Sequence, residues 1–237
     1  QVMPTSGTID PSAGDQAWKS EFSHDDEIAM PGYQRLYLNK HDVWTELTST
    51  KRATIYRFKY TKKNKAQILT NLGGYLGNST MINADVKKVS QTQLEGSFDS
   101  AGRFWGGPEK VKIHFVIQFD KPFESLDGWS DKKKFKNISS LQGTGTMKRQ
   151  DAFVLGPIEN ARINLQTEAK HWDFDRYKED SFKVWKEKLG KIEVKGGTEQ
   201  QRIKFYTDLW HVLLGRRILN DVSGDYPDYT QGELVNT

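Results

Sequence analysis

The feature that most constrains the fold is a run in which every second residue is apolar: Val111, Ile113, Phe115, Ile117 and Phe119. This period of two predicts a β-strand with one buried face. Weaker runs of β-branched and aromatic residues predict further strands at residues 33–38, 43–48 and 53–60, and a pair of strands within residues 86–98. Glycine-rich turns separate these runs, and no helical pattern intervenes, which favours an antiparallel β-sandwich over a parallel α/β sheet.

The pattern changes near residue 160. We interpret residues 161–168 as a last strand or the start of a transition. Residues 173–189 then have helical spacing, with one apolar stripe along Phe174, Tyr177, Ser181, Val184, Trp185 and Leu189. Asp173 is the expected N-cap and Gly190 the expected end of this helix.

A second helix is predicted from a capping box at residues 198–201 through about Leu214. The tail, residues 220–237, is predicted to form no element. Two amphipathic helices do not bury both of their faces alone. We therefore expect a sandwich domain over residues 1–168, followed over residues 169–237 by linker helices and the start of a larger helical unit.

Composition excludes several classes of protein. The 237 residues contain no cysteine, which rules out disulfides, thiolate metal sites and cysteine nucleophiles. No apolar run approaches the roughly 20 residues that a membrane-spanning helix needs. Residues 51–65 carry seven basic groups and no acid, among aromatic residues. That run is compatible with nucleic-acid binding, but we favour a strand with a solvated basic face and expect no nucleic-acid partner.

Residues 23–27 (SHDDE) concentrate a hydroxyl, an imidazole and three carboxylates. Oxygen ligands of this kind bind cations, so His24 and Asp25 are candidate site residues. The segment lacks the alternation and glycine of an EF-hand loop, and adjacency alone does not build a Ser–His–Asp triad. We favour an acidic surface turn.

Carboxylates alternate with tyrosines at residues 221–229, where Asp225 and Tyr226 are candidates for sugar binding. Aromatic rings stack on pyranose rings, and carboxylates accept hydrogen bonds from sugar hydroxyls. A solvated loop explains the same residues equally well. Trp105, in a glycine-rich turn, and Trp129 are possible sugar platforms. Residues 171–175 (HWDFD) are expected to pack between the two regions at a helix start.

Glycoside hydrolysis generally needs two carboxylates on either side of the scissile bond. The chain has 31 acidic residues, and nothing in their spacing identifies such a pair. The five histidines show no zinc-binding spacing.

Several segments in order resemble glycoside hydrolase family 92: residues 22–33 (FSHDDEIAMPGY), 46–52 (ELTSTKR), 158–165 (IENARINL), 172–175 (WDFD), 198–211 (TEQQRIKFYTDLWH) and 221–226 (DVSGDY). The resemblance implies an inverting, calcium-dependent exo-α-mannosidase that acts on N-glycans or mannan. It implies a bacterial protein that is secreted, periplasmic or at the cell surface. It also implies an N-terminal β-sandwich followed by helices and an (α/α)6 toroid.

The family's WDTFR segment and its toroid carboxylates have no counterpart in this sequence. The chain therefore resembles an internal piece of such an enzyme and is expected to be inactive alone. The catalytic residues and calcium ligands are expected outside it, and Asp225 and Tyr226 are the nearest candidates for the rim of the site. The alternative is a non-catalytic carbohydrate-binding sandwich. The sequence leaves the mannose linkage and the oligomeric state open.

Overall fold

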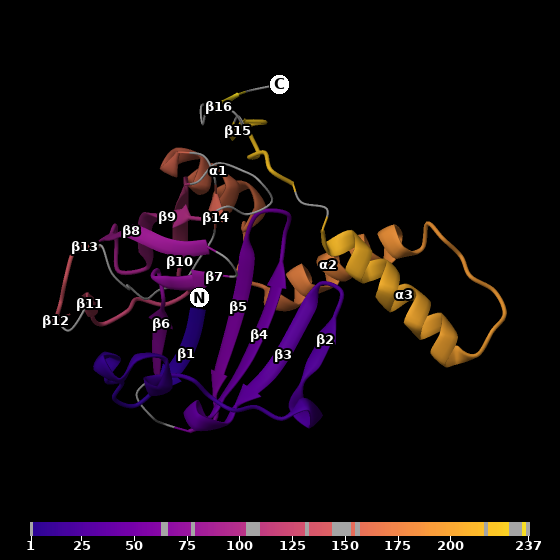
Figure 1. Cartoon of the computed structure of the whole chain (residues 1–237), viewed down its shortest axis with the longest axis horizontal. Helices are drawn as coiled ribbons and strands as arrows, with labels where there is room; N and C mark the ends of the chain where they lie inside the picture. Colours follow the sequence, from indigo (N-terminus) through magenta and orange to yellow (C-terminus); the bar gives the residue numbers. More distant parts are fainter. Residues whose placement is uncertain are drawn as a thin grey trace.

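A computed structural model describes residues 2–62, 66–76, 79–102, 110–130, 133–143, 153–154, 157–215, 218–227 and 234–235. These residues form mostly antiparallel β-structure followed by three α-helices, which confirms the predicted fold class. Figure 1 shows the two larger sheets as separate layers, with the helices beside them.

The four-stranded sheet has the order β2-β3-β4-β5, and its strands are β2 (Ile28–Met30), β3 (Tyr33–Leu38), β4 (Val43–Ser49) and β5 (Thr54–Tyr60). The strands predicted at residues 33–38, 43–48 and 53–60 are thereby confirmed. The short connection after β3 is a 3-10 turn, η3 (Asn39–His41), and Asp42 follows it in the left-handed region at φ 50°. Each neighbouring pair is antiparallel, so the sheet is a simple meander.

The six-stranded sheet has the order β13-β8-β9-β10-β14, with β7 also paired to β8. Its strands are β7 (Gly74–Leu76), β8 (Ser79–Lys88), β9 (Gln93–Ala101), β10 (Lys110–Gln118), β13 (Ser140–Gly143) and β14 (Phe153–Val154). The alternation in β10 is confirmed, because Phe115 and Ile117 lie in the main hydrophobic core with Phe98 and Leu94 of β9. Val116 faces the other side and packs against a helix.

Three further strand pairs complete the β-structure: β1 (Val2–Ser6) with β6 (Ala66–Thr70), β11 (Gly128–Ser130) with β12 (Lys133–Phe135), and β15 (Tyr226–Pro227) with β16 (Leu234–Val235). The last pair corrects the prediction that the tail forms no element. Two-residue strands are too short for a sequence pattern to reveal. The remaining 3-10 turns are η1 (Pro11–Ala17) and η2 (His24–Asp26).

The three helices are α1 (Ile158–Glu168), α2 (Phe174–Leu189) and α3 (Glu199–Leu214). The predicted caps of the last two are confirmed. Asp173 accepts from the backbone of Arg176, and Thr198 and Gln201 form the capping box. The interpretation of residues 161–168 as a strand is wrong, because they belong to α1. This helix begins after Pro157 without a side-chain cap, so it lacks the usual starting signal.

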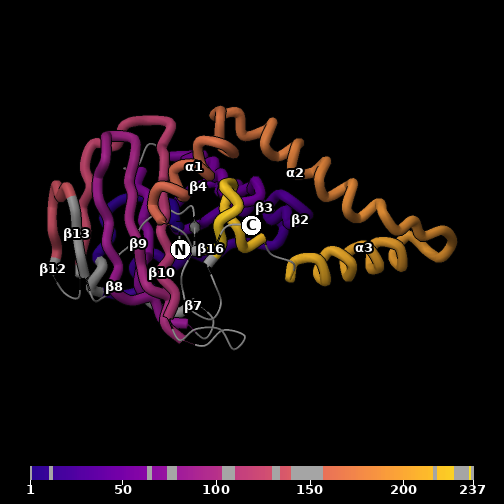
Figure 2. The backbone as a smooth tube through the Cα atoms, turned by 90° about the horizontal axis from the view of Figure 1, so that it is seen from above, coloured from indigo at the N-terminus to yellow at the C-terminus, as the bar shows by residue number. Residues whose placement is uncertain are grey.

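Two of the helices pack on different sheets, α1 on the six-stranded sheet and α2 on the four-stranded sheet. Ala161 of α1 packs on Val116 of the six-stranded sheet. The first turns of α2 bury Phe174 and Tyr177, and Ser181, Trp185 and Leu189 are partly buried, whereas Val184 is 51% exposed, so most of the predicted apolar stripe is at least partly covered. Figure 2 shows α2 extending away from the sheets and α3 running back toward them. The expected boundary at residue 168 falls at the end of α1, and the division into domains stays a prediction.

Candidate functional site

The first predicted candidates, His24 and Asp25, lie in η2 on the surface. The side chain of His24 is 86% exposed, and its Nδ1 lies 2.6 Å from Glu27 Oε2. The Ser23 hydroxyl caps the turn by accepting from the Asp25 backbone N–H at 3.2 Å. These contacts suit the acidic surface turn that the sequence favours. Figure 1 places β15, which contains Tyr226, near α1 and away from β2, the strand that follows η2.

Asp225, by contrast, is partly buried and belongs to an arrangement that we call the amide–carboxylate cluster: Asn160, Asn164, Asp221 and Asp225. Asn160 Nδ2 donates to Asp221 Oδ2 at 2.8 Å and to Asp225 Oδ2 at 3.1 Å. Asn164 Nδ2 donates to the other oxygen, Oδ1, of Asp221 at 2.8 Å. Both asparagines lie on α1 and, with Asp221, are less than a tenth exposed. Both oxygens of Asp221 thus accept an amide N–H away from water.

The cluster shapes the turn at residues 220–225. The Val222 N–H donates to Asn164 Oδ1 at 2.8 Å, so this amide donates to the turn and accepts from it. The Asp221 N–H donates to the Asp225 carbonyl at 2.7 Å, and Gly224 sits in the left-handed region at φ 96°. The Ser223 hydroxyl donates to Asp225 Oδ2 at 2.6 Å. Sequence reasoning singled out Asp225 and Tyr226 but missed Asn160 and Asn164.

A second contact fastens the same turn to the other sheet. Arg52, in the connection between β4 and β5, donates through Nε to the Asn220 carbonyl at 2.8 Å and through Nη1 to Glu168 Oε1 at 2.6 Å. Thr50 also donates to Glu168, at 2.6 Å. Burial raises the pKa of Glu168, but the hydrogen bonds from Thr50 and Arg52 outweigh it and hold that pKa below its ordinary value.

The outer face of the six-stranded sheet is polar. Arg162 of α1 donates two hydrogen bonds to the carboxylate of Glu95 in β9, at 2.5 and 2.7 Å. Asp99, 1% exposed, pairs with Lys110 at 2.7 Å and with Lys112 at 3.3 Å. Burial and then Lys112 lower the pKa of His114 on the neighbouring strand. The buried carboxylates on this face are therefore held ionised by cations.

The pKa values of the carboxyl groups can be compared with those that glycoside hydrolysis uses. A general acid of a glycosidase has a raised pKa, so that it is protonated at working pH. Among the described residues, every carboxyl group with a resolved shift has a lowered pKa: Asp42, Glu46, Glu95, Asp99, Glu168 and Asp175. None of these six carboxyl groups therefore has the raised pKa of such an acid.

The aromatic candidates have structural surroundings. Trp105 lies outside the described residues. The ring of Trp129 in β11 packs 6.3 Å from that of Trp18, a core residue. Phe174, in the predicted 171–175 segment, is buried beneath the Arg57 guanidinium at 4.3 Å, as expected for packing between the two regions. The same expectation is wrong for Trp172, which is 59% exposed.

The basic run is also partly neutralised within the chain, because Arg52, Arg57 and Lys62 form ion pairs with Glu168, Glu46 and Asp42, respectively. These pairs favour the reading of this run as a strand with a basic face, and we retain the expectation of no nucleic-acid partner.

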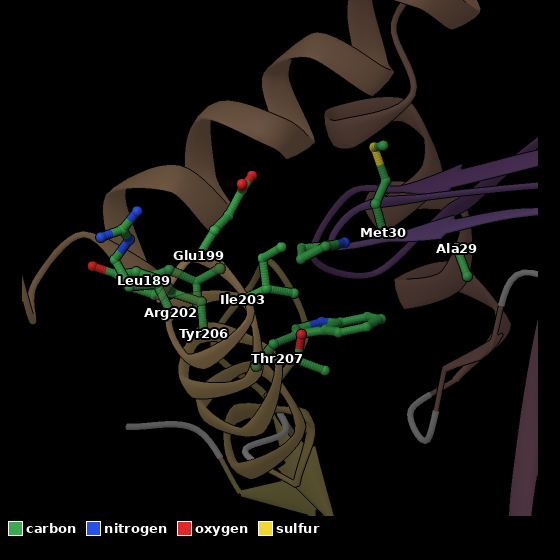
Figure 3. A pocket seen from close by; sticks show the side chains of 10 residues that line it. Ala29, Met30, Leu189, Glu199, Arg202, Ile203, Tyr206 and Thr207 are labelled. Carbon is green, nitrogen blue, oxygen red and sulfur yellow. The ribbon is translucent and has the colours of Figure 1, made fainter. Parts of the chain in front are cut away.

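An open groove of about 570 Å³ lies between the start of the four-stranded sheet and α3. Figure 3 shows Met30 on the β2 side and Ile203 and Tyr206 on the α3 side. Glu199 and Arg202 are the charged lining residues. The groove contains none of the predicted site residues.

Calcium does not fit the described residues. No group of three or more histidine, aspartate or glutamate side chains suited to a metal occurs among them. In the amide–carboxylate cluster, the amide N–H groups of Asn160 and Asn164 point at the carboxylate oxygens that a cation would need. This part of the chain therefore supplies no complete calcium site.

Two family models together match residues 1–236 of the chain. The model of the glycosyl hydrolase family 92 N-terminal domain matches residues 1–184, and that of the family 92 catalytic domain matches residues 160–236. A search of curated proteins found no match. None of the helices in the described ranges is long and apolar enough to cross a membrane.

Solved structures show the same fold. The family 92 α-mannosidase BT3965 from Bacteroides thetaiotaomicron has a TM-score of 0.87 at 21% identity, covering 100% of this chain and 34% of its own. The inverting mannosidase BT2199 from the same organism has a TM-score of 0.84 at 18% identity, covering 99% of this chain and 33% of its own. The chain thus spans about a third of the length of these structures.

Proposed function

The chain belongs to glycosyl hydrolase family 92, and on that premise we propose that it is part of a glycoside hydrolase that releases terminal mannose from α-mannosides. The observation that carries this proposal is the match of two consecutive family models, which overlap over residues 160–184 and leave almost no residue uncovered. The sugar is suggested by similar structures named as mannosidases, one of them in complex with mannoimidazole.

Within this enzyme, we assign the 237 residues the role of scaffold. The sandwich and α1 hold the turn at residues 220–225, from which the catalytic region continues. The chain spans about a third of the similar structures, and the catalytic-domain model matches only its residues 160–236, which supports the placement of the catalytic acid, base and calcium ligands elsewhere in the polypeptide. The chain alone is then inactive, and calcium is a cofactor of the complete enzyme.

The substrates we propose are the α-mannosides of N-glycans or mannan. Polymeric glycans lie outside bacterial cells, so we place the enzyme in the periplasm, at the cell surface or in the medium. The similar structures from Bacteroides thetaiotaomicron support a bacterial origin. Fractionation of the source cells, with mannosidase activity measured in each fraction, tests this location.

The activity is tested on a family 92 polypeptide that contains these residues. Proton NMR follows hydrolysis of α-1,2-, α-1,3- and α-1,6-mannobiose, with a β-mannobiose and maltose as control substrates. We expect calcium-dependent release of mannose from an α-linked substrate only, with β-mannose as the first anomer formed. Failure on all three α-mannobioses would overturn the proposal. Retention of the polypeptide on immobilised mannan without hydrolysis would instead support a binding module.

A further inference from the structure

The turn at residues 220–225 is tied to both large sheets. From one side, α1, which packs on the six-stranded sheet, presents Asn160 and Asn164 to Asp221. From the other side, Arg52 of the four-stranded sheet donates to the Asn220 carbonyl while it pairs with Glu168 at the end of α1. Arg52 lies in the N-terminal match alone, and Asn220 lies in the catalytic match alone.

Because the contacting side chains are buried, their hydrogen bonds form in only one position of the turn. Asn164 is 2% exposed and Asp221 is 6% exposed, so neither side chain has bulk water as an alternative partner. A buried carboxylate that loses a hydrogen-bond partner leaves an unsatisfied charged group. The turn is consequently held in the one position at which both oxygens of Asp221 meet the two amides.

We propose that Asp221 and Asn164 are positioning residues, and that the amide–carboxylate cluster sets the direction in which the chain continues after α3 into the rest of the catalytic region. The strand pair β15–β16 begins directly after this turn, at Tyr226. A change in the position of the turn therefore shifts the residues that follow it. The expected effect on catalysis rests on the proposed function, whereas the hydrogen bonds that hold the turn do not depend on it.

An exchange of the two side chains tests the cluster. N164D places a carboxylate against the Asp221 carboxylate, and D221N places an amide N–H against the donors of α1. The double variant N164D/D221N restores complementarity. The carboxylate introduced at position 164 then accepts from the Val222 N–H and from the new amide at position 221, whose oxygen accepts from Asn160. Net charge is the same as in the parent.

Hydrogen exchange of the Val222 and Gly224 amides in the 237-residue chain reads the turn directly, because these N–H groups bond to Asn164 Oδ1 and the Asp221 carbonyl. We expect each single variant to exchange about tenfold faster there, which corresponds to the loss of one hydrogen bond to a charged group. The double variant should return to within about threefold of the parent. Single variants with parental exchange, or a double variant as fast as the singles, would overturn the proposal.

Activity is measured on the longer family 92 polypeptide with the α-mannobiose that it hydrolyses best. The single variants should lose about tenfold or more in kcat/KM, and the double variant should recover most of that loss. D208N, on exposed α3, is the control and should match the parent.

Where N164D prevents folding, Arg52→Lys is the milder variant, because lysine does not hold Glu168 and Asn220 at once. Arg52→Lys should also speed exchange in the turn. D221N, which alters the cluster itself, must do so, and an unchanged rate in D221N would overturn the proposal. If the parent hydrolyses no α-mannoside, the proposed function is wrong. Hydrogen exchange still tests whether the amide–carboxylate cluster holds the turn.

Discussion

Gly32, in the turn between β2 and β3, and Ser181 of α2 approach so closely that a Cβ on Gly32 would lie 2.5 Å from Ser181 Oγ. The same Cβ would lie 3.1 Å from Cδ1 of Trp185. Gly32 also has φ +83°, where side chains other than glycine are strained. Both the backbone conformation and the close approach of α2 therefore favour glycine at this position.

Gly32→Ala should lower the free energy of unfolding by about 2 kcal/mol, because left-handed strain adds to the clash with α2. Gly7→Ala is the matched control. Gly7 has φ +74°, and its added Cβ would meet nothing within 4 Å, so this variant reports the backbone strain alone. Urea unfolding measures both variants. Equal losses in the two would mean that the contact between Gly32 and Ser181 contributes nothing.

Glu168→Gln should make the chain less sensitive to acid. The pKa of Glu168 is lowered in the folded state, so its ionised form contributes stability above the ordinary value of 4.5. That contribution is lost as the pH falls through the folded pKa. The variant should be less stable than the parent near neutral pH and should decline less steeply below pH 4.5. Glu193→Gln, whose side chain is 75% exposed, is the control. An acid profile of Glu168→Gln that parallels the parent would contradict this account.

Arg57→Lys should loosen α2. The Arg57 guanidinium donates to both oxygens of Glu46 at 2.7 and 2.9 Å, to Asp175 at 2.8 and 3.1 Å, and covers the ring of Phe174. Lysine keeps the charge but not the planar, forked geometry. Because Arg57 is partly exposed and screened, we expect a loss of about 1 kcal/mol in urea unfolding. Arg176→Lys, at an exposed position of α2, should change nothing, and a similar loss there would point to a general effect of arginine.

Calcium should not stabilise the 237-residue chain. A ligand that binds only the folded state raises the melting temperature, and the described residues form no complete calcium site. Thermal unfolding followed by circular dichroism should therefore give the same midpoint in millimolar calcium and in a chelator. Magnesium at the same ionic strength is the control for charge screening. A rise specific to calcium would place a metal site within this chain.

The sequence predicted the parts of the fold that repeat locally. The alternation of β10 and the caps at Asp173 and Thr198 depend on neighbours within a few residues, and all three are confirmed. The helix α1 was missed because its inner face carries Asn160 and Asn164, which interrupt the apolar stripe. Their partner Asp221 lies 57 residues beyond Asn164, and no local pattern encodes a pairing at that separation. Two asparagines four residues apart were the available signal.

The most direct test of the scaffold role is mannose release from α-mannobiose by the 237-residue chain itself, its intact mass confirmed, with and without calcium. We expect no turnover in either condition, while a longer family 92 polypeptide that contains the chain hydrolyses the same substrate with calcium. Calcium-dependent turnover by the chain alone would contradict the account. The catalytic carboxylates would then lie within these residues, and Asp221, Asp225 and Asp228 would be the first to substitute.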